Sequence, residues 1–365
     1  LGTNYQERLK KWVLHAEENG LTVAGALTDA KGDRSLTPSK QAEPDTTLHI
    51  KEVREDGIVI RGVKAMICST AASQEIFLLP GSVYKEEDKA CALSCVVPRD
   101  IEGLTVVEAT RPSDQREYNE EGINEVPDTG ITQGWLLFDD VFVPNDRVFM
   151  CQEYKYTSKV IGFFTANYRA CIGACVAGQG DVMIGASILM ARANGLSSKT
   201  FMNKLVDMSI NNQVTFGLGA GALAVGTKHP SGTWVADPLT AHTNKVMVAT
   251  LPYEVKRLTQ EIGGGIVETG CMPSSKDLEN PEYGDMLKKV MKAGACSTES
   301  RVKAARLSEW LTLGGGIPGC MHGGGSPDGA KLVVRFATPM EKYADYARNV
   351  MDIEEEITDP AKTKK

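Results

Sequence analysis

Two cysteines four residues apart, Cys171 and Cys175, stand in the Gly- and Ala-rich segment Phe164–Asp181. Side chains at this spacing share one face of a helix, and two thiolates supply half of a four-ligand metal or cluster site. Such a pair is more often core packing, and no Cys-x-x-Cys pair occurs among the nine cysteines. We therefore predict no metal site completed by this chain alone, with Cys171 and Cys175 as candidate ligands should another chain add two thiolates.

Two glycine clusters mark the other candidate sites. Gly263, Gly264 and Gly265 follow a helical pattern, and one glycine is enough to end a helix. Three glycines let a backbone approach a ligand closely, so we favour contact with a cofactor over a plain helix cap. His322 precedes the glycines 323–325. Lone histidines are more often structural than acid/base groups, but this glycine-rich setting makes His322 a candidate for proton transfer.

The composition is that of a globular protein from a reducing compartment. The chain has 365 residues, 42% hydrophobic and 24% charged, and its net charge of −7 is spread along the sequence. This excludes the clustered basic face of a nucleic-acid-binding protein. No run of about 18 apolar residues predicts a membrane span. An odd number of cysteines without a signal peptide predicts reduced, mostly buried thiols and a cytoplasmic location.

The hydrophobic pattern changes twice and predicts three segments, 1–44, 45–150 and 151–365. Residues 5–19 have apolar side chains at helical spacing, and Gly20 ends the pattern. Alternating and β-branched runs then predict strands at 48–53, 57–63, 76–79, 90–98, 104–109 and 135–143. After about residue 155 no strands are expected, and helices are predicted at 157–192, 198–218, 236–262, 284–293 and 296–313. The predicted fold class is α+β, a β domain followed by a helical bundle.

Five separated motifs carry a resemblance to a known family, at 24–34 (AGALTDAKGDR), 54–65 (REDGIVIRGVKA), 142–147 (FVPNDR), 151–154 (CQEY) and 321–327. From Gly2 to about residue 350 the chain resembles the 4-hydroxybutyryl-CoA dehydratase family, which shares its fold with the reduced-flavin-dependent 4-hydroxyphenylacetate 3-monooxygenases. The resemblance implies an acyl-CoA-dehydrogenase-like fold, with a sandwich- or barrel-like middle β domain before a C-terminal helical bundle. It also implies that a helical domain precedes Leu1, so that 1–44 holds a remnant helix and a flavin-side loop.

The same resemblance implies bound FAD. In relatives the loop at 27–34 lies against the flavin, and a donor to the ring near the end of the following long strand falls on Cys68 here. The helix end at 263–265 receives the adenosine diphosphate of a neighbouring subunit's FAD, which implies a homo- or hetero-oligomer of tetramer size. The residues implied to bind FAD are Thr28, Lys31, Arg34, Lys64, Cys68, Ser69, Gly263, Gly264 and Gly265.

The residues that carry chemistry in the family are replaced in this chain. Tyr168 takes the place of a cluster-binding His, Ile172 that of a Tyr and Val176 that of a Lys. Two family carboxylates fall on Gln133 and Gly319. An amide keeps the hydrogen bonding of a carboxylate but cannot act as a base. The candidates left for catalysis are His322, Gln133 and Glu153, and an iron–sulfur cluster is not expected in this chain alone.

Three functions stay open. The first is a flavin-dependent lyase or oxidoreductase acting on a small molecule, an acyl-CoA thioester, whose carbonyl eases removal of the neighbouring proton. The second is a reduced-flavin-dependent aromatic monooxygenase, which fits the absence of cluster ligands. The third is a supporting, non-catalytic subunit paired with a complete homologue. A separate chain that supplies the N-terminal domain and its cysteines would favour the third function.

Overall fold

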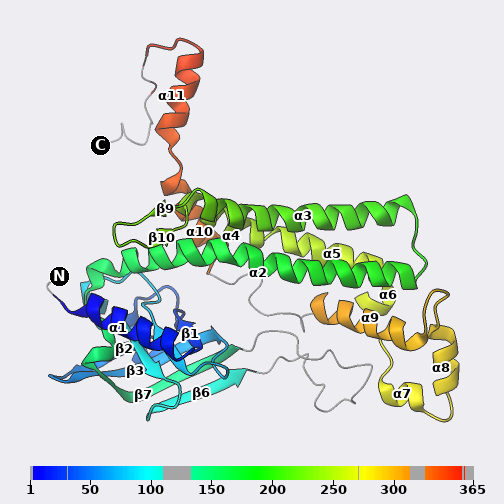
Figure 1. Cartoon of the computed structure of the whole chain (residues 1–365), viewed down its shortest axis with the longest axis horizontal. Coiled ribbons are helices and arrows are strands. Elements are labelled where there is room, and N and C mark those ends of the chain that lie inside the picture. The colour runs from blue at the N-terminus through cyan, green and yellow to red at the C-terminus, as the bar shows by residue number, and fades with distance from the viewer. Residues whose placement is uncertain are drawn as a thin grey trace.

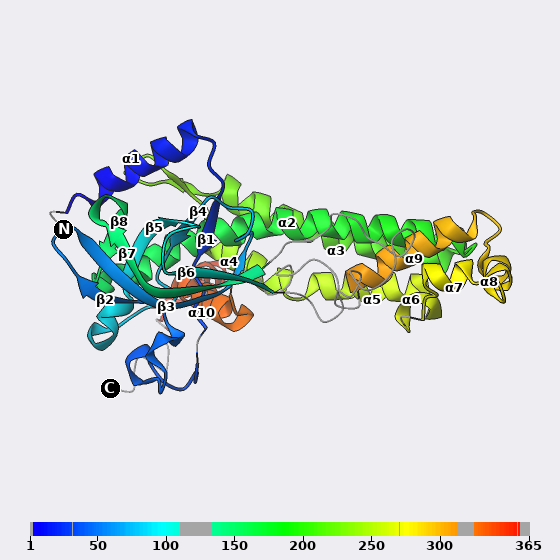
Figure 2. The ribbon, with the colours of Figure 1, turned by 90° about the horizontal axis from the view of Figure 1, so that it is seen from below.

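The computed structural model of the chain has a β domain beneath one end of a bundle of long helices (Figures 1 and 2). The structure describes residues 3–30, 32–109, 133–269, 271–312, 325–355 and 357. The two longest helices extend well past the β domain, so the molecule is elongated. Its two halves meet near the first part of α2 (Thr157–Ala193).

The β domain consists of two four-stranded sheets packed face to face. One has the order β1-β4-β5-β8 and the other β2-β3-β7-β6. Alternate residues of each strand face inward, so both sheets contribute to one core. Ile60, Leu78 and Leu136 are fully buried in it. The strands are β1 (Val23–Ala26), β2 (His49–Val53), β3 (Gly57–Cys68), β4 (Glu75–Leu78), β5 (Leu93–Pro98), β6 (Leu104–Ala109), β7 (Gln133–Pro144) and β8 (Val148–Cys151).

The helical half is organised around α2 and α3 (Lys199–Ala224), which are joined by the short turn 194–198 and pack along each other. Met190, Met208 and Ile262 lie in the core that they share with the neighbouring helices. The remaining elements are α1 (Tyr5–Glu18), the hairpin β9 (Thr227–Lys228) and β10 (Trp234–Val235), α4 (Pro238–Val248), α5 (Leu251–Gly263), α6 (Gly265–Glu268), α7 (Ser275–Glu279), α8 (Gly284–Met291), α9 (Thr298–Thr312), α10 (Pro327–Ala337) and α11 (Met340–Val350).

The structure corrects the predicted elements at several points. The single helix expected at 236–262 is two helices, because Pro252 stands in the first turn of α5 and has no N–H to continue α4. The hairpin β9–β10 occupies a region where no strands were expected, and it turns at Gly232. Strand β1, which pairs with β4, also lies where no strand was predicted, and the loop at 27–34 follows it.

The burial of the cysteines also differs from the prediction. Of the cysteines that the structure describes, only Cys91 and Cys95 are buried, so the expectation of mostly buried thiols is wrong. Cys171 and Cys175 are exposed on α2. The pattern of small residues around them is therefore not a sign of burial within this one chain.

One helical stretch, Tyr154–Ala193, is apolar and long enough to cross a membrane by length and composition. Half of its most apolar window is buried inside the protein. That burial is typical of the central helix of a packed bundle.

Candidate functional site

The ends of β3 and β7 place Cys68 and Gln133 directly opposite each other. The Gln133 Nε2 donates to the Cys68 Sγ at 3.4 Å. Ser69 follows in the left-handed backbone region, with φ of 59°, and turns the chain out of the strand. Both Cys68 and Gln133 are half-buried. The structure thus brings together a predicted cofactor-binding residue and a predicted catalytic residue.

Helix α2 places Tyr168 and Cys175 close to Cys68. Burial raises the pKa of the Tyr168 phenol and of the Cys175 thiol, and the nearby Cys68 raises both further. Tyr168 stacks on Phe164 with ring centroids 5.5 Å apart, and the Gln179 Nε2 donates to the Cys175 Sγ at 3.8 Å. Groups with raised pKa values stay protonated at neutral pH, so this face offers hydrogen-bond donors instead of bases.

The metal candidates do not converge on one site. Within the residues that the structure describes, no group of three or more His, Cys, Asp or Glu side chains is placed to hold a metal ion. Cys171 and Cys175 alone supply half of the ligands that a zinc or iron–sulfur site requires. The predicted absence of a cluster in this chain alone stays a prediction.

Helices α2 and α4 bury three basic side chains, Arg169, His242 and Lys245. Arg169 is 7% exposed and Lys245 is fully buried, and the Asn244 Nδ2 donates to the Arg169 carbonyl at 3.0 Å. Burial and the nearby Arg169 lower the pKa of Lys245 to about 8. The same two causes lower the pKa of His242. Basic groups perturbed in this way gather at functional sites more often than elsewhere.

The lowered pKa of Lys245 predicts how stability changes with pH. Between pH 8 and the ordinary lysine value of 10.5, the unfolded chain holds a proton that folded Lys245 has released. Stability therefore rises with pH across this window, by about 1–2 kcal/mol after solvent screening is allowed for. In the Lys245→Met variant, this increase in stability with pH is expected to be absent. Urea unfolding of both proteins at pH 7.5 and pH 10 measures it, with the exposed Lys303→Met as control. A pH-independent difference between wild type and Lys245→Met would contradict the assignment.

A buried ion pair anchors the loop that follows β1. The Lys64 Nζ lies 2.7 Å from the Asp29 Oδ1 and donates to the carbonyls of Leu27 and Leu79, each at 2.8 Å. An ammonium has three protons, so these partners use all of them. The Tyr84 hydroxyl donates to the other Asp29 oxygen at 3.3 Å. Lys64 is 2% exposed, so its ammonium is enclosed by these partners and holds the loop in place.

The rest of this loop is closed by hydrogen bonds. The Ala65 N–H donates to the Thr28 carbonyl at 2.8 Å. The Gln41 side chain accepts from the Asp33 N–H at 2.9 Å and donates to its carbonyl at 2.7 Å. Arg34 is exposed beside this closure. Thr28 and the residue before Arg34 are thus each held by hydrogen bonds, and Lys31 lies outside the described residues.

Sequence reasoning missed one acidic side chain, Glu108 of β6. Its Oε1 accepts from the Thr70 hydroxyl and, at 2.9 Å, from the Ala71 N–H. Its Oε2 is buried and has no hydrogen-bond partner among the described residues. Glu108 lies opposite Gly134, one residue from Gln133. There was little indication in the sequence that the Oε2 of Glu108 is buried, because a single acidic residue in a strand-like run usually marks the solvent-exposed face of the strand.

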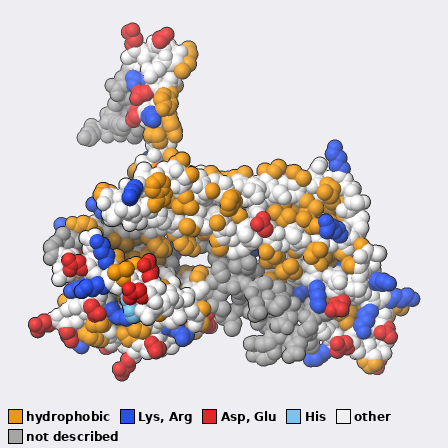
Figure 3. Space-filling model, in the orientation of Figure 1, with side chains coloured by type: hydrophobic (Ala, Val, Ile, Leu, Met, Phe, Trp, Pro, Cys, Tyr) orange, Lys and Arg blue, Asp and Glu red, His pale blue; other side chains and the backbone are white. Residues whose placement is uncertain are grey.

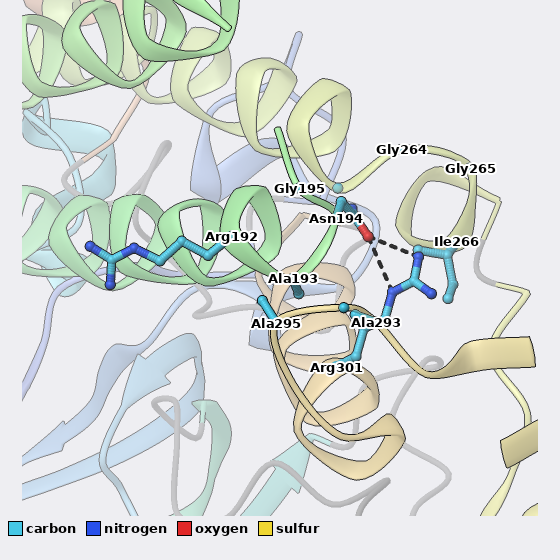
Figure 4. Close-up of a pocket in the computed structure, with 12 residues that line it drawn as sticks. Arg192, Ala193, Asn194, Gly195, Gly264, Gly265, Ile266, Ala293, Ala295 and Arg301 are labelled. Atoms are coloured by element: carbon cyan, nitrogen blue, oxygen red, sulfur yellow. Dashed lines mark hydrogen bonds between the residues drawn. The ribbon is translucent and has the colours of Figure 1, made fainter. Parts of the chain in front are cut away.

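A second site is the glycine-lined cavity shown in Figure 4, with a volume of about 510 Å³. It lies where the end of α2 meets the junction of α5 and α6. Gly264 has φ of 71°, and a side chain at Gly264 or Gly265 would meet no atom within 4 Å, so both backbones face open space. Arg301 donates to the Asn194 Oδ1 from Nε and from a terminal nitrogen, at 3.1 and 2.8 Å. A fixed guanidinium beside open glycine backbone suits a phosphate group.

One predicted catalytic residue, Glu153, stands apart from these sites. Glu153 accepts from the Tyr5 hydroxyl at 3.1 Å and from the Cys151 N–H at 2.6 Å, which ties it to α1 and β8. It is not brought to Cys68 or to the glycines. His322 and Gly319 lie outside the described residues.

Comparison with known families decides the assignment. The model of the N-terminal part of 4-hydroxyphenylacetate 3-hydroxylase matches residues 1–150, and that of its C-terminal part matches residues 158–352. The chain belongs to the 4-hydroxyphenylacetate 3-hydroxylase family. Within it, the chain is 35% identical to 4-hydroxybutyryl-CoA dehydratase/vinylacetyl-CoA-Δ-isomerase of Clostridium aminobutyricum, over 91% of this chain and 71% of the relative.

Solved structures of the 4-hydroxyphenylacetate 3-hydroxylase family confirm the predicted fold. An oxygen-tolerant archaeal 4-hydroxybutyryl-CoA dehydratase from N. maritimus has a TM-score of 0.93 at 33% identity, covering 98% of this chain and 73% of that one. The oxygenase component of 4-hydroxyphenylacetate 3-monooxygenase, complexed with FAD and 4-hydroxyphenylacetate, has a TM-score of 0.82 at 19% identity, covering 95% and 73%. The predicted β domain followed by a helical bundle is therefore the family's fold.

Proposed function

We propose that this chain is an FAD-binding flavoprotein that acts on an acyl-CoA thioester. The observation that carries the FAD assignment is the glycine-lined cavity, where open backbone at Gly264 and Gly265 lies beside the fixed Arg301. FAD carries a pyrophosphate that suits this combination, whereas FMN would leave the cavity unused. The oxygenase component of 4-hydroxyphenylacetate 3-monooxygenase, a member of the same family, was solved as a complex with FAD.

The residues near Cys68 suit the flavin ring of an FAD whose adenosine diphosphate would lie in the glycine-lined cavity of a neighbouring subunit. Cys68, Ser69 and Gln133 present a thiol, a hydroxyl and an amide at the exit of β3, and the loop that carries Thr28 is fixed by Lys64. Bound flavin supplies electron and hydride chemistry that these side chains lack. The chain's own contribution is to orient a ring by hydrogen bonds and to keep the Cys175 thiol and the Tyr168 phenol protonated nearby.

Closing the glycine-lined cavity is expected to weaken FAD binding. Gly264→Trp places a bulky side chain where the backbone is open, so we expect the FAD dissociation constant to rise at least about 10-fold. Oligomerisation should weaken with it. The matched control is Gly232→Trp, which also has a positive φ, 92°, and open space, but lies in the β9–β10 turn. Flavin absorbance and an FAD titration measure both variants. Equal FAD affinity in wild type and Gly264→Trp would show that the glycines are only a helix end.

The thioester assignment rests on sequence similarity, since the 35% identical relative is a dehydratase of 4-hydroxybutyryl-CoA. A reduced-flavin aromatic monooxygenase is the second candidate, favoured by the solved complex with 4-hydroxyphenylacetate. Assaying the holoprotein with acyl-CoA thioesters, and with phenols plus reduced flavin and oxygen, separates the two candidates.

A supporting subunit is the third candidate, favoured by the non-basic groups at Tyr168 and Gln133. Copurification of a complete homologue, with activity only in the complex, would favour it. In each case the proposed assembly is an oligomer, a homotetramer or a hetero-oligomer, and the proposed location is cytoplasmic. Mass measurement of the purified protein by light scattering tests the assembly.

A further inference from the structure

Strand β3 ends in a turn whose backbone is held in an unfavourable conformation. Ser69 has φ of 59°, and this left-handed region is unfavourable for a residue that has a Cβ atom. Met66, two residues before Cys68, has φ of 58° and lies where the ladder to β7 is irregular. Conformations of this kind persist only where surrounding groups hold them, and they gather at functional sites. Cys68 therefore leaves the sheet between two backbone positions that depend on their surroundings.

Glu108 of β6 supports this turn from a strand that does not pair with β3. One carboxylate oxygen, Oε1, accepts from the Thr70 hydroxyl and, at 2.9 Å, from the Ala71 N–H. Thr70 and Ala71 directly follow Ser69 in the chain, and Thr70 is fully buried. Losing an acceptor costs a buried hydroxyl more than it costs one at the surface. The carboxylate thus fixes the two residues that follow the left-handed position.

Strand β7, which lies between β3 and β6 in the sheet, leaves room for this contact. Its Gly134 is paired with Glu108. A Cβ atom on Gly134 would collide with the Thr70 hydroxyl and lie 3.3 Å from the Glu108 Oε1, so the close approach requires glycine. The residue before it, Gln133, donates to Cys68. The two contacts therefore occur at adjacent positions of β7.

Two other hydrogen bonds help to close the turn. The Ser73 hydroxyl donates to the Ser69 carbonyl at 2.8 Å, within the turn itself. Arg99 donates from Nη1 to the Ala71 carbonyl at 3.0 Å, but Arg99 is exposed, so water competes for this bond. Glu108 therefore provides the connection between the turn and the inner face of the sheet.

We propose that Glu108 is a positioning residue of the flavin site, which fixes the direction in which Cys68 and Ser69 face the ring. The proposal rests on the proposed function, because the ring is that of the FAD assigned there. Glu108 and Cys68 occupy opposite faces of the sheet, since their partners Gly134 and Gln133 are adjacent on β7. Glu108 therefore acts through the turn and not by touching the ring.

A positioning role requires an acceptor and no proton transfer. Both donors reach Oε1, and Oε2 has no hydrogen-bond partner among the described residues. An amide oxygen can therefore take over both hydrogen bonds in Glu108→Gln. Glu108→Leu keeps a similar volume and removes them. A residue that acts as a base would instead lose its role in both variants.

Alkylation of Cys68 in the apoprotein tests whether Glu108 holds the turn. Peptide mass spectrometry after timed exposure to iodoacetamide gives the rate for this one thiol. Glu108→Leu is expected to raise the rate at least about 10-fold, and Thr70→Val to raise it less, because a looser turn uncovers the half-buried thiol. Glu108→Gln should keep the wild-type rate. Acidic side chains also lie on the surface of the β domain (Figure 3), and Glu102→Leu, at one exposed position, is the control.

The alkylation rates can overturn the proposal in two ways. An unchanged rate in Glu108→Leu and Thr70→Val would show that the carboxylate does not hold the turn. Equal acceleration by Glu108→Gln and Glu108→Leu would show that an acceptor is not what the turn needs. These rates require no flavin. They decide the role of Glu108 even if the wild-type protein binds no FAD, an outcome that would refute the proposed function alone.

The midpoint potential of bound FAD tests whether the turn orients groups toward the ring. Glu108→Leu should lower it, because hydrogen-bond donors that face the ring favour its electron-rich, reduced form. Glu108→Gln should keep the wild-type potential. The control is Ile50→Ala, 5% exposed on β2 at the opposite edge of the same sheet, which lowers stability without touching the turn. Equal potentials in Glu108→Leu and wild type, or equal shifts in Glu108→Leu and Ile50→Ala, would reduce Glu108 to a structural residue and overturn the proposal.

Discussion

Lys64→Met is expected to destabilise the protein by about 3–5 kcal/mol, the usual cost of leaving one member of a buried ion pair without its partner. Asp29 is 6% exposed and would be left with two long hydrogen bonds, from the Tyr84 hydroxyl at 3.3 Å and the Leu48 N–H at 3.4 Å. The carbonyls of Leu27 and Leu79 would lose their donor as well. Urea unfolding at pH 7 measures the loss.

Two further variants isolate the buried pair as the cause. Combining Lys64→Met with Asp29→Leu removes both charges, and replacing a buried ion pair by apolar residues is often close to neutral. Most of the loss should therefore be recovered, which a double-mutant cycle expresses as coupling between the two sites. Lys303→Met breaks an exposed pair with Glu299, 2.9 Å apart, and should cost less than about 1 kcal/mol. Similar losses for Lys64→Met and Lys303→Met would refute the anchoring role.

The order of helices and strands was predictable because the β domain and the helical half differ in the spacing of their hydrophobic residues. Alternation at 48–53 and helical spacing at 157–192 predicted β2 and α2 closely. Short elements such as β1 were not predictable, since four residues carry too little pattern and depend on pairing with β4. The break between α4 and α5 was visible as Pro252, but apolar spacing on both sides hid it.

The site was predictable in part. Cys68 was expected to bind a flavin and Gln133 to be a candidate for catalysis, and their direct contact follows from a strand register that no sequence motif records. Lys64 was expected to bind the cofactor, but its ammonium is enclosed because Asp29, 35 positions earlier, returns to it through an isolated bridge. Exposed Cys171 and Cys175 were expected to be core residues, because their Gly- and Ala-rich segment has the composition of a core.

The purified chain is expected not to dehydrate 4-hydroxybutyryl-CoA at an enzymatic rate, which is the largest of the expected effects. The family reaction, as the resemblance implies, removes an unactivated proton and expels a hydroxyl, and it needs a base and carboxylates. The positions that would supply them are Tyr168, whose raised pKa keeps it protonated, and Gln133, an amide bonded to a thiol. Ile172 and Val176 are buried aliphatic side chains, 5% and 3% exposed.

The expected loss of dehydratase activity is large because several acid/base groups are replaced at once. One missing acid/base group costs about 10²–10⁴-fold, and groups that act as a unit do not simply multiply. For the same reason Gln133→Glu alone should not restore the reaction. Crotonyl-CoA formation is measured on FAD-loaded protein, with iron content determined on the same sample. Rates of about 1–10³ per second, typical of enzymes, would show that other groups do the chemistry. Glu108→Gln would then be the first variant to make. Glu108 lies opposite Gly134, next to Gln133, and its buried Oε2 has no hydrogen-bond partner among the described residues.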